Sequence, residues 1–321
     1  MAVKEPLAAI VGPTATGKSV LALHVAARLK AEIISVDSAQ VYRGMDIGTA
    51  KVPPKERVGP GGVPIAHHLI DIVDPDEPFS VADFQKMART TITSILQRGH
   101  LPMLVGGTGL YYQAVVDPYI FTPMPGDKKI RHNLEAMAQK YGNEYLYAEL
   151  QKVDPEAAER IHLHDRRRLI RALEVYLMTG KPISAALEWR RKQESPYQLA
   201  AVALTMPRHK LYRRIEARVD AMIAQGLVEE VRGLLKRYDY RLPALQALGY
   251  KEIGAYLRGE MGLAEAIELL KRNTRRLAKR QLTWFRRDKR LYWLEVEPNN
   301  IEEMAEKIVG YIAEHLDINV Q

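Results

Sequence analysis

Short apolar stretches alternate with amphipathic ones in the first third of the chain. Leu7–Val11 is apolar throughout, Val20–Leu29 repeats apolar side chains at helical spacing, and Glu32–Val36 is again largely apolar. A further amphipathic segment, Val81–Arg98, precedes an apolar one, Leu101–Val105. Short apolar runs suit strands that are buried on both faces, and strands that alternate with helices form parallel units. The predicted fold class is therefore α/β, with a mostly parallel sheet and helices on both faces.

The pattern changes after Val116. Three prolines between 118 and 125 interrupt it, and residues 128–191 have helical periodicity without a clear strand. A strand is predicted again at Gln198–Thr205, and a last strand and helix are predicted within 291–316. We therefore predict one core domain formed by both ends of the chain, 1–118 and 198–321, with an all-helical insertion between them, 119–197.

Composition narrows the class of protein. The chain has 321 residues, 47% of them hydrophobic, and no cysteine. This predicts a globular protein without disulfides, a catalytic thiolate or a cysteine zinc site. No apolar run is long enough to span a membrane, and the first strand begins too close to the N-terminus for a signal peptide, so we expect a cytoplasmic protein with no membrane partner. The pairs His67–His68 and His162–His164 lack a full set of metal ligands at the usual spacing.

The positive charge of the chain is concentrated in one segment. Residues 271–290 contain ten Lys or Arg and one acid, Asp288, while the whole chain has a net charge of only +8. In helical phase Leu270, Leu277 and Trp284 share one face, and the basic side chains fall on the others. A solvated basic face without a partner is the simpler interpretation. A run of one sign repels itself unless a polyanion neutralises it, however, which favours a nucleic acid as the partner.

Residues Gly12–Ser19 read GPTATGKS, the full glycine-rich phosphate-loop motif, between a predicted strand and a predicted helix. In that context the loop amides and the helix N-terminus form a site for a di- or triphosphate. Gly12 and Gly17 permit backbone angles that a side chain forbids, Lys18 reaches the outer phosphates, and the Ser19 hydroxyl binds Mg²⁺. An ordinary turn before a helix is the alternative. The predicted phosphate-binding residues are Gly12, Thr14, Ala15, Thr16, Gly17, Lys18 and Ser19.

Two more turns follow predicted strands, Asp37–Gln40 and Gly106–Gly109. Because the carboxyl ends of parallel strands lie together, we expect both turns to face the phosphate loop. Three roles are open for Asp37: a Mg²⁺ ligand through water, a general base, or a cap for its own turn. Thr108 either offers a hydroxyl to the site or serves as a turn residue.

The strand at Leu101–Val105 ends in Gly-Gly. Enzymes that hydrolyse ATP usually have an acid there that helps to hold Mg²⁺. The absence of an acid at this position argues against an ATPase or a motor. It leaves a small-molecule kinase or another transferase that uses a phosphate compound.

Eight segments, spread over almost the whole chain, form a specific ordered set. They are GPTATGKS (12–19), DSAQVYRGMDIGTAK (37–51), HHLIDIVDP (67–75), FSVADF (79–84), VGGTGLYYQA (105–114), RRLIRALEVY (167–176), ALGYKEI (247–253) and RRLAKRQLTWFRR (275–287). In this set the chain resembles the tRNA dimethylallyltransferases. It is similar to their bacterial form, because it lacks the cysteine-containing zinc finger that eukaryotic relatives often add.

The resemblance implies transfer of a dimethylallyl group from its pyrophosphate to N6 of the adenosine 3′ of the anticodon, with Mg²⁺ as cofactor. Asp37 would take a proton from the amine, and Thr108 would lie at the reaction centre. Lys18, Arg214 and Arg218 would stabilise charge on the departing pyrophosphate, which the residues of the phosphate loop bind. Apolar walls for the five-carbon chain, with plain core packing as the alternative, are expected from Val41, Leu110, Tyr111 and Tyr112.

The resemblance also implies contacts with the tRNA anticodon stem-loop, mostly at phosphates and partly from the helical insertion. The adenosine must leave its stack to reach a buried site, so base flipping is expected. The enzyme is expected to be a monomer. The implied tRNA-binding residues are Asp37, Ser38, Ala39, Gln40, Thr108, Arg131, Arg167, Arg168, Arg171, Gln246, Gly249, Tyr250, Lys251, Arg275, Arg276, Lys279, Arg280 and Gln281.

Two other activities stay open. A small-molecule or nucleoside kinase shares the loop, the sheet and an acid after the second strand, but it has no need for the basic segment 271–290. A relative that prenylates free adenine nucleotides shares the core chemistry, with less need for the insertion 119–197. The compound that receives the transferred group distinguishes the three activities.

Overall fold

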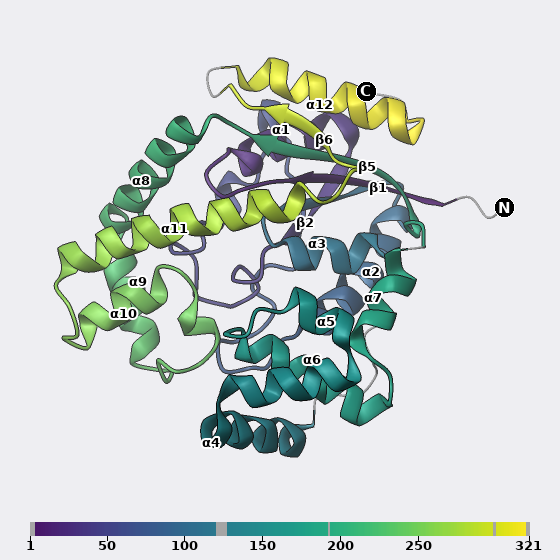
Figure 1. The fold of residues 1–321 in the computed structure, drawn as a ribbon. Helices are drawn as coiled ribbons and strands as arrows, with labels where there is room; N and C mark the ends of the chain where they lie inside the picture. Colours follow the sequence, from purple (N-terminus) through teal and green to yellow (C-terminus); the bar gives the residue numbers. More distant parts are fainter. Residues whose placement is uncertain (1–3, 120–126, 192, 298–299, 319–321) are drawn as a thin grey trace. The chain divides into compact units, whose positions relative to one another are not determined.

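A computed structural model of the chain describes residues 4–119, 127–191, 193–297 and 300–318. Its strands are β1 (Glu5–Val11), β2 (Ala31–Val36), β3 (His67–His68), β4 (Leu101–Gly106), β5 (Tyr197–Thr205) and β6 (Tyr292–Glu295). They form one sheet (Figure 1). The strand order is β3-β2-β4-β1-β5-β6, and every neighbouring pair is parallel.

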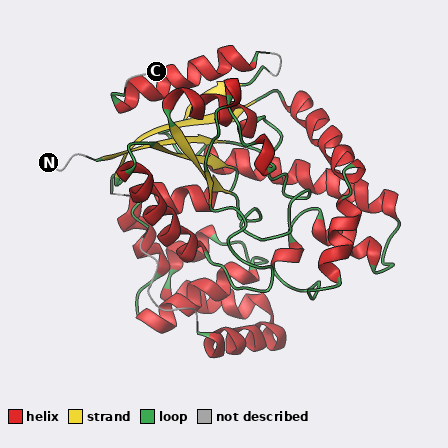
Figure 2. Ribbon diagram, turned by 180° about the vertical axis from the view of Figure 1, so that it is seen from behind, coloured by secondary structure: helices red, strands yellow, loops and turns green. Residues whose placement is uncertain are grey.

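Helices cover both faces of this sheet (Figure 2). One face carries α1 (Lys18–Leu29) and α12 (Ile301–Leu316), and the other carries α2 (Val81–Gln97) and α3 (Gly109–Val116). The start of α2 is fixed by a reciprocal capping box between Ser80 and Asp83. The prediction of a parallel α/β sheet with helices on both faces is confirmed.

The central strand shows why the sequence is apolar without alternation. Leu7, Ala9 and Val11 pack into the core under α2 and α3, and Ala8 and Ile10 pack into the core under α1 and α12. All five side chains are fully buried. A strand covered on both faces has no position left for a polar side chain.

A third apolar core lies within a helical layer. Met45, from the loop after β2, is buried among its helices, so this layer also holds one side of that loop. The layer is built from α8 (Arg208–Ala224), α9 (Leu227–Leu235), α10 (Tyr250–Leu257) and α11 (Leu263–Phe285).

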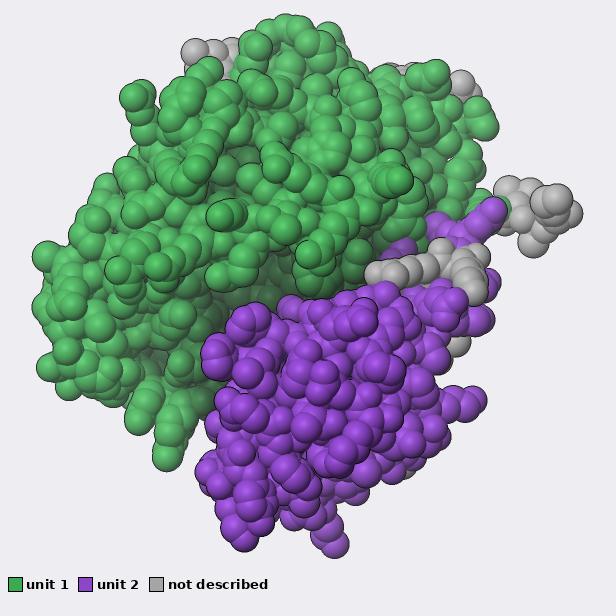
Figure 3. Space-filling view, in the orientation of Figure 1, with its two compact units in different colours: residues 1–116, 196–321 green, residues 117–195 purple. Residues whose placement is uncertain are grey.

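The chain divides into two compact units, Met1–Val116 with Pro196–Gln321, and Asp117–Ser195 (Figure 3). The smaller unit corresponds to the stretch for which we predict a helical insertion, 119–197. Its described part contains helices and no strand, and it has an apolar core of its own. Its helices are α4 (Lys128–Val153), α5 (Pro155–Arg160), α6 (Arg166–Thr179) and α7 (Ile183–Arg191).

Some elements give no signal in the hydrophobic pattern. β3 has only two residues, too few for any periodicity, and it is a strand because it pairs with β2. The helices α8, α9 and α10 lie in a region for which the pattern names no element. The predicted break at Pro123 and Pro125 lies outside the described residues.

We expect Gly109→Ala to destabilise the protein. A Cβ at this position would lie 2.2 Å from Cδ1 of Trp284, in a packed indole ring. Overpacking of this kind costs about 1–3 kcal/mol in the free energy of unfolding, which denaturant titration measures. Gly310→Ala in α12 is the matched control, because a Cβ there meets nothing within 4 Å and alanine favours a helix. Equal losses in both variants would contradict the prediction.

Candidate active site

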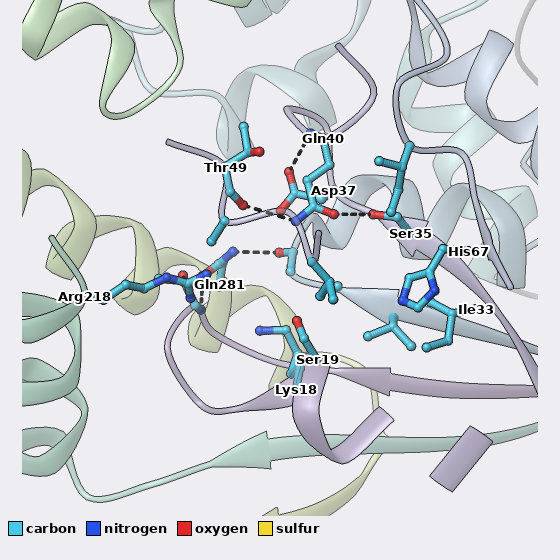
Figure 4. Close-up of a pocket in the computed structure, with 17 residues that line it drawn as sticks. Lys18, Ser19, Ile33, Ser35, Asp37, Gln40, Thr49, His67, Arg218 and Gln281 are labelled. Carbon is cyan, nitrogen blue, oxygen red and sulfur yellow. Dashed lines mark hydrogen bonds between the residues drawn. The ribbon is translucent and has the colours of Figure 1, made fainter. Parts of the chain in front are cut away.

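Three turns meet at the carboxyl edge of the sheet. They follow β1, β4 and β2, and since β4 lies between the other two strands, its turn lies between theirs. A pocket opens among these turns, as expected, within the larger unit (Figure 4). We call it the central pocket. It is lined by Thr14, Lys18, Ser19, Ile33, Ser35, Asp37, Gln40, Thr49, Ala50, Val52, His67, Ile70, Val105, Gly106, Gly107, Arg218 and Gln281.

The phosphate loop joins β1 to α1 in a tight turn. Gly12 has a φ of +138°, and an added Cβ would lie 2.6 Å from the carbonyl oxygen of Leu204. Lys18 folds back over the loop, and its Nζ donates to the carbonyl of Pro13 at 2.6 Å. No side chain caps α1, so the amides of its first turn are available to an anion.

Three cationic side chains surround this loop. Arg214 and Arg218 of α8 each donate to a loop oxygen, at 2.9 and 3.3 Å. Burial, followed by repulsion from Arg218, lowers the pKa of Lys18 to about 7, although Asp37 acts in the opposite direction. Burial likewise lowers the pKa of Arg218. An anion in the pocket would relieve this unfavourable crowding of positive charge.

Asp37 and Thr108 organise the other two turns. Oδ1 of Asp37 accepts hydrogen bonds from the amides of Ala39 and Gln40, at 2.9 and 3.4 Å, so the capping role is present. Oγ1 of Thr108 accepts from the Ser38 amide at 3.0 Å and donates to the Ser38 hydroxyl at 3.3 Å. Thr108 therefore ties the turn after β4 to the turn after β2. The role of Asp37 as a base stays a prediction.

Gln281 lies at the phosphate loop, although we predicted it as a tRNA contact. Its Oε1 accepts from the Thr14 amide at 2.9 Å, and its Nε2 donates to the Gly107 carbonyl at 3.0 Å. The Thr14 amide is thereby bonded within the protein, although Thr14 is among the predicted phosphate-binding residues. No sequence pattern signals this contact, because 267 residues separate its partners.

Glu230 is a supporting carboxylate that sequence reasoning missed. It accepts from the three successive amides of residues 46–48, at 3.1, 2.7 and 3.1 Å, and from the Tyr250 hydroxyl at 2.7 Å. The next residue, Thr49, lines the central pocket. Glu230 therefore holds one wall of the pocket from α9. Glu230 is one of two adjacent acids in the first turn of an amphipathic helix, a common pattern that does not indicate such a role.

The basic side chains of α11 divide into two groups. Arg276, Lys279 and Arg280 are exposed, as expected for a surface that binds a polyanion. Arg275 is half-buried, and its Nη1 donates to Glu216 of α8 at 2.6 Å. Arg275 therefore bridges two helices, and its contact with tRNA stays a prediction.

Other predicted tRNA-binding residues are engaged within their own unit. Tyr250 is 1% exposed and belongs to the core of the helical layer, so its side chain does not face solvent. In the smaller unit, Arg131 and Arg171 both bond to the fully buried carboxylate of Glu174, at 2.7 Å each. The remaining set is formed by Arg167, Arg168, Gln246, Gly249 and Lys251, of which Arg167, Arg168 and Gln246 are exposed.

The apolar wall of the pocket differs from the predicted one. Tyr111, Tyr112 and Val41 are buried in the core between the sheet and α2, and the Tyr111 ring stacks on Phe84 at 4.0 Å. Neither they nor Leu110 line the central pocket. The alternative that we left open, core packing, holds for the first three. The apolar lining comes instead from Ile33, Ala50, Val52, Ile70 and Val105.

Comparison with known proteins gives the family. A model described as IPP transferase matches residues 40–288, and one described as isopentenyl transferase matches residues 5–59. A tRNA dimethylallyltransferase of Moorella thermoacetica is 75% identical to this chain and aligns over 100% of it and 99% of the relative. The chain belongs to the tRNA dimethylallyltransferase family. The sequence resemblance is confirmed, and this family member is a transferase.

Solved structures of related transferases have the same fold as this chain. The crystal structure of a tRNA isopentenylpyrophosphate transferase from Bacillus halodurans is 48% identical, with a TM-score of 0.71 over 97% of this chain and 98% of that one. A eukaryotic dimethylallyltransferase acting on tRNA is 27% identical, with a TM-score of 0.83 over 99% and 81%. None of the described helices of this family member combines the length and apolarity that a bilayer crossing requires.

Lys18 should make the stability of the ligand-free protein rise with pH above about 7. Its pKa is about 7 in the fold and 10.5 ordinarily, so between these values the unfolded chain binds more protons. The free energy of unfolding should increase by up to about 1.4 kcal/mol per pH unit across this window, as denaturant titrations at several pH values will measure. Lys18→Met should remove this increase, and Lys86→Met, at an exposed site, should retain it. Identical slopes in all three proteins would contradict the assignment.

Proposed function

We propose that this protein transfers a dimethylallyl group from dimethylallyl pyrophosphate to N6 of the adenosine 3′ of the anticodon in tRNA, releasing pyrophosphate. The observation that carries the proposal is a single pocket lined both by the phosphate loop and by Asp37. The family supports the acceptor, since relatives are named for tRNA. The exposed cations of α11 supply a surface suited to its phosphates.

The chemistry follows from the two sides of the pocket. The bond between the prenyl carbon and the pyrophosphate oxygen breaks, and a bond from N6 to that carbon forms. The lone pair of N6 is delocalised into the purine, so Asp37 takes the N6 proton as the new bond forms. Lys18, Arg214 and Arg218 stabilise the charge that develops on the departing pyrophosphate. The adenosine enters the pocket flipped out of its stack.

A divalent cation, for which we propose Mg²⁺, fits the same pocket. The Ser19 hydroxyl lines it, and oxygen donors suit a hard cation. Among the described residues, no group of three or more His, Cys, Asp or Glu side chains could hold a metal alone. Pyrophosphate oxygens and water would therefore complete its coordination. When bound, the cation would neutralise negative charge on the leaving group.

A kinase is the less favoured function. A kinase for small molecules has no use for the exposed cations Arg276, Lys279 and Arg280 of α11. Transfer to free adenine nucleotides would use the same pocket chemistry. The acceptor that receives the label distinguishes it from transfer to tRNA.

The test uses dimethylallyl pyrophosphate labelled in its prenyl group, offered separately with tRNA, AMP and ATP. We expect label on tRNA alone. Asp37→Asn should slow the single-turnover transfer by about 10²–10⁴-fold while tRNA binding is retained, because asparagine keeps the Oδ1 acceptor for the two turn amides. Label on a nucleotide instead of tRNA, or phosphate transfer from ATP, would overturn the proposal. Equal loss of binding and turnover in the variant would assign Asp37 a docking role.

Removing Arg276, Lys279 and Arg280 together by alanine substitution should weaken tRNA binding and flatten its salt dependence. Each tRNA phosphate that no longer pairs with a cation lowers the slope of log K against log salt by about 0.7–0.9. Binding titrations between low and moderate salt measure this slope. Lys30→Gln is the matched control, because Lys30 is exposed just before β2, at the opposite edge of the sheet. A slope as steep as that of the unchanged protein would show that this face does not bind tRNA.

A further inference from the structure

Two side chains join the three turns of the central pocket in a row. Thr108 ties the turn after β4 to the turn after β2, which carries Asp37. Gln281 ties the same middle turn to the phosphate loop after β1. The donor side and the acceptor side of the proposed reaction are therefore connected across the middle turn, through Gln281 on one side and through Thr108 on the other. Figure 4 shows Gln281 at this place beside Arg218.

The side-chain amide of Gln281 is bonded on one side to Thr14 and is bonded and packed on the other against Gly107. Its amide uses the oxygen for the Thr14 N–H and the nitrogen for the Gly107 carbonyl. A Cβ on Gly107 would lie 2.4 Å from Nε2 of Gln281, so the amide fills the space that a side chain at 107 would need. One turn further along α11, Trp284 fills the corresponding space above Gly109. The end of α11 thus packs directly onto the middle turn.

Thr14 is held from a second direction. Its hydroxyl accepts from Nη1 of Arg218 at 3.3 Å, while its amide donates to Gln281. Without Gln281, the first half of the loop would keep its link to α8 and the pairing of β1 with β4, and it would lose its side-chain link to the turn that carries Thr108. The distance between the leaving pyrophosphate and the acceptor amine would then be set less tightly.

We propose that Gln281 is a positioning residue that sets the spacing between the pyrophosphate site and the acceptor site. This proposal rests on the proposed transfer reaction and extends it to a residue that touches the protein backbone on both sides. The nucleophile, the prenyl carbon and the leaving oxygen must lie in line, and misplacement by about 1 Å can cost about 10²-fold in rate. Gln281 therefore acts on the chemical step more than on the affinity for either substrate.

The central variant is Gln281→Met, which keeps the length and the stem of the side chain and removes both hydrogen bonds. We expect its single-turnover rate at saturating tRNA and dimethylallyl pyrophosphate to fall by about 10–100-fold, with both dissociation constants changed less than about 3-fold. Arg280→Ala, at the neighbouring exposed position, should show the reverse: weaker tRNA binding and a nearly normal rate at saturation. Thr283→Ala is the control for α11, because the Thr283 hydroxyl bonds only within the helix, to the carbonyl of Lys279.

The outcomes are distinct. A Gln281→Met enzyme with weakened tRNA binding and a normal saturated rate would overturn the proposal and make Gln281 a tRNA contact. A normal rate and normal binding would also overturn it. If Gln281→Met does not fold, Gln281→Glu decides, since it keeps the acceptor for Thr14 and loses the donor to Gly107. A saturated rate equal to that of the unchanged protein would then overturn the proposal. Failure of the unchanged protein to transfer the group to tRNA would instead refute the proposed function.

Discussion

The whole site depends on the order of three parallel strands. Because β4 lies between β1 and β2, the phosphate-loop turn and the turn that carries Asp37 lie on opposite sides of the middle turn, each one strand away from it. A nucleophilic displacement needs its entering and leaving atoms on opposite sides of one carbon. The sheet provides two such sides at a fixed spacing, and the middle turn provides the space between them. The strand order is therefore the constraint from which the chemistry follows.

Close packing around the middle turn fixes the spacing between the two outer turns. Val105 leads into two glycines, and each of Gly106, Gly107 and Gly109 has a neighbour where a side chain would lie. Gly106 approaches the backbone of Val36, and the other two meet side chains of α11. Bulk at any of these positions would push β2 or α11 away. Glycine is required here for space, since none of the three has a positive φ.

Electrostatics gives the same edge of the sheet its preference for an anion. Lys18, Arg214 and Arg218 converge on the loop, and burial makes the charged form of Lys18 unfavourable enough to lower its pKa to about 7. Asp37 is the acid whose attraction partly offsets this cost. This crowding of positive charge is unfavourable, and an anion bound between these side chains would relieve it. The exposed cations of α11, in contrast, face solvent and form the surface proposed for tRNA.

The sequence by itself determined the parts that depend on neighbouring residues. The strand-loop-helix around GPTATGKS, the buried strands, the Asp37 turn and the ordered family segments all follow from short-range patterns, and the parallel fold follows from their order. Only the tertiary structure decided the partners of Gln281, Glu230 and Arg275, which lie 20 to 267 residues away along the chain. It also decided that Tyr111 and Tyr112 belong to the core and not to the pocket wall, because the sequence does not show which of the two an apolar side chain lines. Local periodicity reports burial, whereas the identity of a distant partner is set by how helices and strands pack.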